Sequence, residues 1–219
     1  MPPDFAAALA QGCAALGLAL PPQALGQLAA YAALLQRWSR VHNLTALEHE
    51  DEILSHHLLD CLAIVRPIEE ELGGEAARPR ILDAGSGGGL PGIPLAIARP
   101  AWQCTLLDAV QKKTAFLEQA RIELGLRNVS VRHERLEAPA GETFDAIVSR
   151  AFSSLADFTR LTVHRLAPGG RWLAMKGRDP SGEVASLPGS VECLRTITLR
   201  VPRLDEERRL VVMRVRPGS

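Results

Sequence analysis

Several features typical of membrane or secreted proteins are missing from this 219-residue sequence. No apolar run reaches the roughly 18 residues that a membrane span requires, so we expect no membrane partner. The first residues, Met1-Pro2-Pro3-Asp4, lack the basic segment that opens a signal peptide. The four cysteines form no Cys-x-x-Cys pair, and Cys13, Cys61 and Cys104 have apolar neighbours. We therefore expect reduced, buried thiols in a cytoplasmic protein, and no metal site.

The sequence also lacks net charge and is poor in lysine. Its 25 Lys and Arg balance 25 Asp and Glu, and only three of the cations are lysines. Residues 1–71 hold three Arg against nine acids, net −6, whereas residues 195–219 hold seven Arg against three acids, net +4. A chain without net charge has no global field that attracts a polyanion. The many arginines suit phosphate and base contacts, but a GC-rich genome would supply them equally well.

Internal repeats and low-complexity segments are absent too, and the length fits one α/β domain with a modest extension. In the first part, apolar residues recur at helical spacing, which predicts helices over about 5–17, 22–38 and 51–72, with Asp4 capping the first. Gly73-Gly74 and Pro79 then mark a boundary. We therefore divide the chain into an N-terminal helical extension, residues 1–78, packed on a second unit, residues 79–219.

The second unit alternates short β-rich runs with helical segments, a pattern typical of a parallel sheet covered by helices on both faces. The last two runs are joined by a polar stretch, residues 202–209, which predicts an antiparallel hairpin. A mostly parallel seven-stranded sheet closed by such a hairpin is the Rossmann-like fold of methyltransferases that use S-adenosylmethionine (SAM). The expected strands are 81–84, 104–107, 129–132, 146–149, 172–175, 192–201 and 210–215, and the expected helices 95–98, 112–124 and 155–166.

The most informative segment is the glycine-rich stretch that follows the first strand. Asp83 ends an apolar run, and glycines alternate from Gly85 to Gly89 before Pro91 opens a helical segment. The stretch formally satisfies the dinucleotide fingerprint, but a carboxylate would repel a pyrophosphate and Pro91 removes an N–H that a phosphate needs. SAM has an ammonium for the carboxylate and no phosphate, so the pattern favours SAM over a nicotinamide cofactor or a turn without a ligand. Asp108, which ends the next strand, is placed to hold the ribose hydroxyls.

Several motifs, taken in order, resemble one family, the bacterial small-subunit rRNA guanine-N7 methyltransferases, also called glucose-inhibited division protein B. The likeness runs nearly end to end. It departs from the family's pattern at Ser39, Cys61 and Arg209. The carrying motifs are Trp38…Asn43-Leu44-Thr45, His57-Leu58-Leu59-Asp60, Asp83-Ala84-Gly85-Ser86-Gly87-Gly88-Gly89-Leu90-Pro91-Gly92-Ile93-Pro94-Leu95, Asp108…Lys112-Lys113…Phe116-Leu117, Ser149-Arg150-Ala151-Phe152 and Met175-Lys176-Gly177.

The resemblance implies a cytoplasmic enzyme that methylates N7 of one guanine in the decoding-region loop of 16S rRNA, in the free RNA, the small subunit or an assembly intermediate. We expect a monomer. With the residues of the glycine turn, the resemblance gives this set of cofactor contacts: Asp83, Gly85, Gly87, Leu90, Asp108, Ala109, Val110, Leu136, Glu137 and Arg150.

The chemistry of that reaction needs no general base, because guanine N7 carries a lone pair and no proton. Catalysis then comes from holding N7 in line with the methyl carbon. Arg150 follows a strand at the ligand-binding edge and is our candidate for positioning, against a surface ion pair. An SAM-dependent enzyme with a small-molecule or protein substrate, or a non-catalytic SAM-binding protein, remains an alternative.

The candidate substrate contacts each have a structural alternative. Lys112, with Lys113, opens a helix whose dipole disfavours a cation, so a phosphate contact or a solvated face is expected. Arg135 lies beside the segment on the adenine side and has the same two alternatives. Lys176 follows the next strand after that of Arg150 and lies, like Arg150, at the ligand-binding edge. His57 and Asp60, three apart, share a helix face and form either a guanine pocket or a structural pair. Asn43 contacts the base or caps a turn, and Trp38 is expected in the core. The C-terminal arginines offer a phosphate-binding surface, about half of it merely solvated: Arg195, Arg200, Arg203, Arg208 and Arg209.

Overall fold

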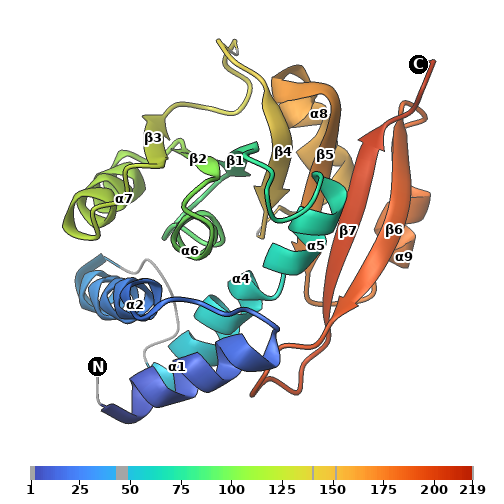
Figure 1. The fold of residues 1–219 in the computed structure, drawn as a ribbon. Coiled ribbons are helices and arrows are strands. Elements are labelled where there is room, and N and C mark those ends of the chain that lie inside the picture. Colours follow the sequence, from blue (N-terminus) through green and yellow to red (C-terminus); the bar gives the residue numbers. More distant parts are fainter. Residues whose placement is uncertain (1–2, 43–48, 140, 151, 219) are drawn as a thin grey trace.

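A seven-stranded sheet forms the centre of the computed structural model, which describes residues 3–42, 49–139, 141–150 and 152–218 (Figure 1). The strand order is β3-β2-β1-β4-β5-β7-β6. The first five strands pair in parallel, and β7 is antiparallel to both β5 and β6. The predicted fold is therefore confirmed, hairpin included. The strands are β1 Arg80–Ala84, β2 Gln103–Asp108, β3 Val129–His133, β4 Phe144–Ser149, β5 Leu166–Lys176, β6 Val191–Leu199 and β7 Arg208–Val215.

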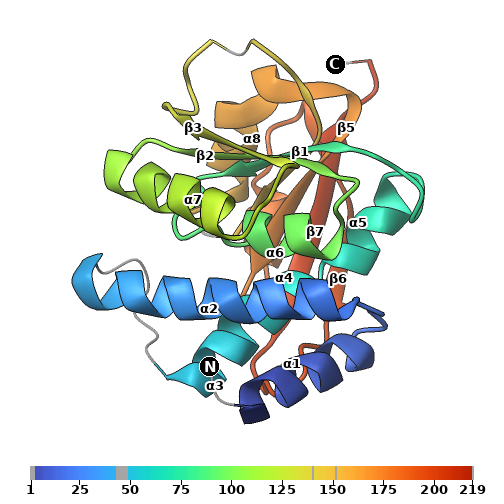
Figure 2. The same cartoon turned by 60° about the vertical axis from the view of Figure 1, so that its left-hand side comes forward.

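Helices cover both faces of this sheet. On one face lie α6 (Gly92–Ala98) and α7 (Gln111–Glu123), and the N-terminal helices form a further layer against them (Figure 2). On the other face lie α8 (Leu155–Thr162), a 3-10 turn (Val163–Arg165) and α9 (Ser181–Ala185), a short helix that the sequence pattern did not indicate. Alternate strand residues accordingly enter two separate apolar cores.

The N-terminal layer differs from its sequence prediction in two respects. Helices α1 (Pro3–Ala15) and α2 (Pro22–His42) are found where expected, although α1 begins one residue before Asp4, so that Asp4 lies in its first turn and does not cap it. The single helix expected over 51–72 is wrong. It is replaced by α3 (Glu50–Glu52), a π-helical segment (Ile53–Leu59), α4 (Asp60–Leu62) and α5 (Val65–Glu71).

The π-helical segment is buried on nearly every side. Six of the seven residues of the π-helical segment are buried, and the segment contacts both α1 and α2. The side chains of Leu54, Leu58 and Leu59 are at most 1% exposed, so apolar contacts surround the segment and are not confined to one stripe. The N–H of Asp60 reaches back to the carbonyl of Ser55, five residues earlier, which widens the turn that carries the two histidines. Wide turns of this kind often occur at functional sites.

Helix α2 also holds the glycine turn in place. The Tyr31 hydroxyl, fully buried, donates to the carbonyl of Gly88 at 2.5 Å. A side chain at Gly88 would press against Leu35 at 3.0 Å. Farther along α2, the Trp38 ring packs against Phe116 of α7 with centroids 5.4 Å apart, so Trp38 supports the core as predicted. No helix of the described residues combines the length and the apolar character that a membrane span needs.

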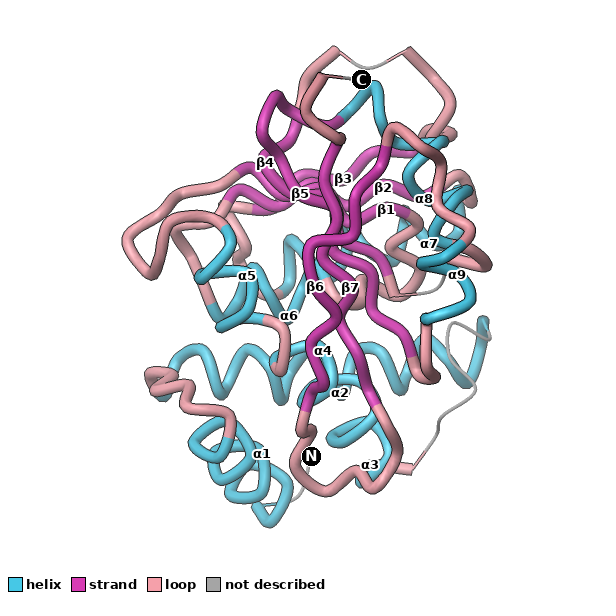
Figure 3. Tube along the Cα trace, turned by 90° about the vertical axis from the view of Figure 1, so that its right-hand side faces the viewer, coloured by secondary structure: helices cyan, strands magenta, loops and turns pink. Residues whose placement is uncertain are grey.

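The strands β1, β2, β4 and β5 run in parallel, so their carboxyl ends lie at one edge of the sheet. The hairpin of β6 and β7 flanks them and reaches toward α1 and α3 (Figure 3). Pairing places Asp83 of β1 beside Val148 of β4, and Lys176 at the end of β5 beside Arg209 at the start of β7. The chemistry-bearing residues of the predicted site therefore come from neighbouring strand ends, as in other open α/β sheets.

Candidate functional site

The turn after β1 has the backbone shape that the glycines predicted. Gly85, Gly87 and Gly89 have φ angles of +72°, +58° and +89°, a region that residues with side chains rarely adopt. The N–H groups of Gly85 and Ser86 donate to the carbonyl of Leu107 on β2 at 2.9 and 3.0 Å. The turn is thereby tied to the neighbouring strand, and Gly85 leaves its backbone exposed toward a ligand.

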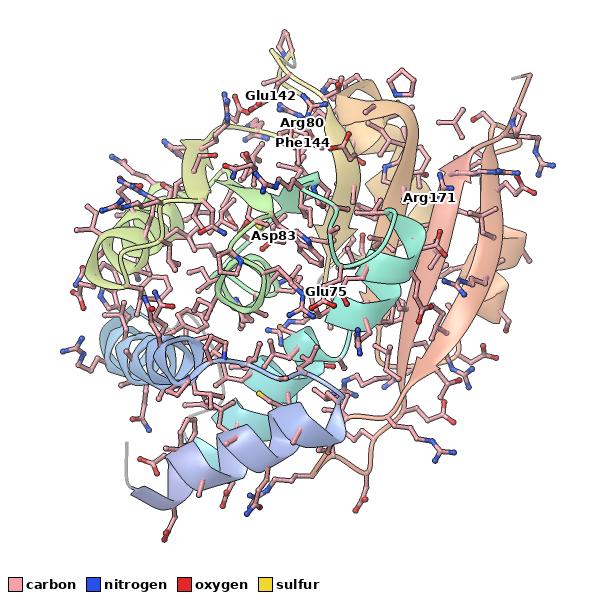
Figure 4. The ribbon with its side chains drawn as sticks, in the orientation of Figure 1. Glu75, Arg80, Asp83, Glu142, Phe144 and Arg171 are labelled. Atoms are coloured by element: carbon pink, nitrogen blue, oxygen red, sulfur yellow. The ribbon has the colours of Figure 1, made fainter. Side chains whose placement is uncertain are left out.

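Asp83 lies at the base of this turn, between β1 and α6 (Figure 4). It is 1% exposed, and its Oδ2 accepts from the Gly92 N–H at 2.9 Å. Its Oδ1 is buried without a hydrogen-bond partner among the described residues. Loss of hydration raises the pKa of this carboxyl to about 7, against the lowering effect of the Gly92 hydrogen bond. A buried carboxylate oxygen with no donor is a fitting acceptor for an ammonium group.

Asp108, at the end of β2, is held by backbone donors from both sides. Its Oδ2 accepts from the Gly87 N–H at 3.0 Å and its Oδ1 from the Val110 N–H at 2.9 Å. The ammonium of Lys113 lies 3.7 Å from Oδ2. These contacts fix the carboxylate at the mouth of the glycine turn, while each oxygen keeps a second lone pair for a hydroxyl group.

A cavity of about 250 Å³ opens beside these groups. Gly85, Leu107, Asp108 and Ala109 form one wall, and the 134–137 segment that follows β3 forms the other. Val110 is 46% exposed next to it. Lys112 and Arg135 are exposed, and neither side chain makes a hydrogen bond or ion pair to another residue in the described ranges.

The residues at this cavity fit the adenosine part of SAM. The glycines allow close backbone approach, the Asp108 carboxylate suits a ribose diol, and Ala109, Val110 and Leu136 supply apolar surface for the base. The buried Oδ1 of Asp83, at the base of the same glycine turn, is an acceptor that suits the ammonium of the same molecule. Leu90, predicted as a further contact, is 7% exposed directly after the turn.

A second cavity, of about 560 Å³, surrounds Arg150. Arg150 follows β4, and its guanidinium donates to the carbonyl of His56 at 2.9 Å and contacts Nδ1 of His57 at 3.2 Å. The same nitrogen lies 3.8 Å from Oδ2 of Asp60. The structure thus brings three predicted site residues together, one from the sheet and two from the N-terminal layer. The lining residues are His56, His57, Asp60, Arg150, Met175, Lys176, Gly177, Arg178, Glu206 and Arg208.

The titratable groups of this second cavity are tied to arginines. Burial and the charge of Arg150 lower the pKa of His57 to about 4, and its Nδ1 lone pair faces the Arg150 N–H. Asp60 lies between Arg150 and Arg208, whose Nε is 3.4 Å from Oδ1. Burial raises the pKa of Asp60, against the lowering effect of these two cations. Neither group is therefore arranged as a free general base.

The remaining predicted cations are less exposed to a substrate than the sequence suggested. The Lys176 ammonium is 13% exposed and bonds to Glu183 at 2.8 Å and to the carbonyl of Phe152 at 3.2 Å. Four arginines of the proposed C-terminal surface are paired with acids: Arg195 with Glu70 and Glu71, Arg203 with Asp51, Arg208 with Asp60 and Glu206, and Arg209 with Glu207. Their charges are thus largely compensated locally.

The sequence analysis did not identify Arg208 and Glu206 as residues that line the second cavity. Arg208 and Glu206 belong to a polar stretch with no local motif, and the sequence pattern did not show that this stretch folds over Asp60. In the structure, the register of β7 against β5 places Arg209 beside Lys176, and no pattern in the sequence indicates that register. Asn43 lies outside the described residues. In the described ranges, no three His, Cys, Asp or Glu side chains gather to hold a metal ion.

Solved structures with the same fold include several methyltransferases. TrmN from Thermus thermophilus matches 74% of this chain and 53% of its own with a TM-score of 0.54 at 20% identity. A SAM-dependent methyltransferase from Geobacter sulfurreducens, solved with S-adenosyl-L-homocysteine, covers 69% of this chain and 90% of its own, with a TM-score of 0.52 at 14% identity. At these identities the likeness shows the fold.

Sequence comparison identifies the family. Residues 24–212 match the profile "GidB: rRNA small subunit methyltransferase G". The protein of that name from Laribacter hongkongensis is 53% identical over 210 residues, 95% of this chain and 97% of its own. The one from Paracidovorax citrulli is 47% identical over 224 residues, 98% of this chain and 92% of its own. The predictions of family and of SAM as cofactor are confirmed, and the chain belongs to the rRNA small subunit methyltransferase G family.

Proposed function

We propose that this protein transfers a methyl group from SAM to N7 of one guanine of 16S rRNA. The coarser statement, that it is an rRNA methyltransferase, follows from its family. The guanine, the atom and the mechanism are the proposal. We further propose that it acts in the cytoplasm as a monomer, with residues 1–78 packed as an extension on the catalytic unit.

The observation that carries the proposal is the pairing of two candidate bases, His57 and Asp60, with arginines in the described part of the larger cavity. His57 faces the guanidinium of Arg150, and Asp60 lies between two guanidiniums. A reaction that must remove a proton would need one of these groups free and of suitable pKa. Guanine N7 attacks the methyl carbon with its own lone pair, the C–S bond breaks, and the electron pair leaves on sulfur. No proton moves, so such a site is sufficient.

In this proposal the two cavities have separate tasks. The smaller one holds the adenosine of SAM through Asp108 and the 134–137 segment, and Asp83 binds its ammonium. The larger one takes the guanine, with Arg150 between them. The charge of Arg150 interacts with Asp83 on the cofactor side and with Asp60 on the other side. Arg150 then orients the base or its phosphate, and positioning supplies much of the rate.

The same proposal assigns tasks to the other candidate residues. His57 and Asp60 shape the wall of the guanine cavity by fixing Arg150, and Lys176 closes its floor through Glu183. Lys112 and Arg135, exposed beside the cofactor cavity, contact the RNA backbone. We include Asn43 among the base contacts on the resemblance alone.

The test is a methylation assay with position mapping. Purified protein and isotope-labelled SAM are incubated with 16S rRNA, as free RNA, as small subunits and as assembly intermediates from a strain without the corresponding activity. Nuclease digestion and mass spectrometry locate the label. We expect one methyl group per molecule, at N7 of one guanine, in at least one substrate. Label at another atom, label only on a protein or small molecule, or SAM binding without turnover would contradict the proposal.

A further inference from the structure

The segment that follows β3 forms half of the cofactor cavity, yet it contains no regular structure. Residues 134–138 include Leu136 and Glu137 and lie opposite Gly85 and Asp108 across the cavity. One backbone hydrogen bond within the segment, from the Ala138 N–H to the carbonyl of Arg135, is 3.1 Å long. A segment with so few internal contacts does not determine its own shape.

One buried side chain supplies the missing contacts. Arg165, in the 3-10 turn after α8, has a side chain only 3% exposed. Its Nε donates to the carbonyl of Leu136 at 3.0 Å, and its second terminal nitrogen donates to the carbonyls of Arg135 and Ala138 at 3.3 and 2.9 Å. Its first terminal nitrogen reaches the Glu134 carboxylate at 3.1 Å. One guanidinium thus binds four of the five residues 134–138, all except Glu137.

The geometry requires arginine in particular. A guanidinium offers five N–H donors in a rigid planar fork, whereas a lysine ammonium is a single point on a flexible stem. A buried cation is costly unless it is paired and hydrogen-bonded, and Glu134 provides the negative partner here. The side chain comes from a different element, about 30 positions away in sequence, so it fixes the segment against the body of the fold.

We propose that Arg165 is a positioning residue for the cofactor: it holds the 134–138 segment in the shape that receives the adenine end of SAM. It does not touch the ligand, because the N–H groups of its guanidinium are already bonded to the segment. The proposal rests on the assignment of the smaller cavity to SAM, and is independent of the RNA substrate. Glu137 is the one residue of the segment whose backbone carbonyl and side chain Arg165 leaves unbound in the described contacts, so it remains available toward the cavity.

The experiment compares wild type with Arg165→Lys and Arg165→Met by calorimetry. The matched control is Arg160→Lys, which changes an arginine of α8 that is 65% exposed and paired with Asp157. We expect the Kd for SAM to rise about tenfold or more in both Arg165 variants, with lysine failing to rescue, and less than twofold in the control. Kinetics should show a raised KM for SAM with kcat at saturating SAM nearly unchanged.

A ligand series separates positioning from general loss of stability. S-adenosylhomocysteine and S-inosylhomocysteine differ only in the base, so the ratio of their Kd values measures how well the protein reads adenine. This ratio should move toward one in Arg165→Lys, whereas a merely destabilised protein would weaken both ligands equally and keep the ratio. Thermal unfolding of the same samples confirms that each variant is folded.

If the folded variants bind SAM as wild type does, or keep the wild-type ratio, the role of Arg165 is refuted. These binding results need no RNA. If the guanine-N7 proposal failed, the binding results for Arg165 would still hold. If Arg165 proved to have no role, the guanine-N7 proposal would be unaffected.

Discussion

The two cavities at the carboxyl edge of the sheet stabilise their buried titratable side chains in different ways. Around the smaller cavity, Asp83 and Asp108 accept hydrogen bonds from backbone N–H groups of the glycine turn and of the corner after β2. Around the larger cavity, Asp60 and His57 face guanidiniums from distant parts of the chain. Backbone donors come with the local sequence, whereas side-chain donors depend on the whole fold. The contacts around the cofactor cavity therefore depend mainly on residues close together in sequence, whereas those around the larger cavity depend on residues far apart.

The most disruptive test of the cofactor side is Gly92→Ala. A methyl group there would lie 2.1 Å from Leu106 Cδ2 and 2.7 Å from Asp83 Oδ2, and overpacking of this kind typically costs about 1–3 kcal/mol, occasionally more. We expect the free energy of unfolding to fall by at least about 3 kcal/mol, with loss of SAM binding. Gly26→Ala in α2, where nothing lies within 4 Å, is the control and should be neutral or slightly stabilising. Equal denaturation midpoints for the two variants would contradict the packing argument.

A chemical test of the same side is Asp83→Asn, which keeps the size and removes the negative charge. We expect the Kd for SAM to rise about 30-fold or more, because a buried ion-paired contact is lost. Calorimetry measures it. Unchanged affinity would show that the ammonium of the cofactor binds elsewhere.

The test of the larger cavity is Arg150→Ala. It removes the contacts to His56, His57 and Asp60, so we expect kcat/KM for the RNA substrate to fall about 100-fold, in line with the cost of misplacing a reactive group. Methylation kinetics on a variant shown to be folded provide the measurement. Wild-type kinetics would eliminate Arg150 as a positioning residue.

The pKa of Asp83 makes the cofactor side pH-dependent. Burial raises it to about 7 in the free protein, so the folded state holds a proton that the unfolded state releases near the usual value of 3.8. The free protein should therefore lose stability as the pH rises from about 4 to 7, relative to Asp83→Asn. SAM needs the ionised form, so its affinity should increase from pH 5.5 to 7.5 in wild type. Calorimetric titrations that show the same trend in Asp83→Asn would refute this assignment.

The smallest expected effects concern the exposed cations beside the larger cavity. Arg178 is exposed and makes no ion pair within the described ranges, whereas Arg209 is 26% exposed and bonds to Glu207. We expect Arg178→Gln to reduce the salt dependence of RNA binding by about 0.7–0.9 in log–log slope, the value for one phosphate contact. Arg209→Gln should change it less. Filter binding at several salt concentrations gives both slopes. A larger change for Arg209→Gln than for Arg178→Gln would contradict the view that Arg178 contacts phosphate and the paired Arg209 does not.

The difference between the two cavities also decides what sequence reasoning could reach. The seven strands, the antiparallel hairpin at the end of the chain and the glycine turn follow from short-range patterns, and the structure reproduces them. Residues such as Asp108 were placed correctly because a strand end fixes them. By contrast, Arg208 and Glu206 meet Asp60 and His56 across about 150 positions, and Arg165 reaches a loop about 30 positions away. No periodicity predicts such pairs.

The π-helical segment illustrates the same limit. Its residues repeat at helical spacing, so the pattern indicated one regular helix over 51–72. Nothing in that spacing distinguishes the wider π-helical turn from an α-helical one. That turn orients His57 and Asp60 toward Arg150. Spacing of three residues correctly suggested that these side chains lie together, but not the arginines that they would meet.

A crystal structure with bound SAM tests the central claim most directly. The account predicts the amino-acid end beside Asp83, the ribose on Asp108, the adenine between Ala109 and Leu136, and the methyl group directed toward the cavity around Arg150. Density for SAM in another cavity, or a diphosphate-containing ligand on the glycine turn in its place, would contradict it.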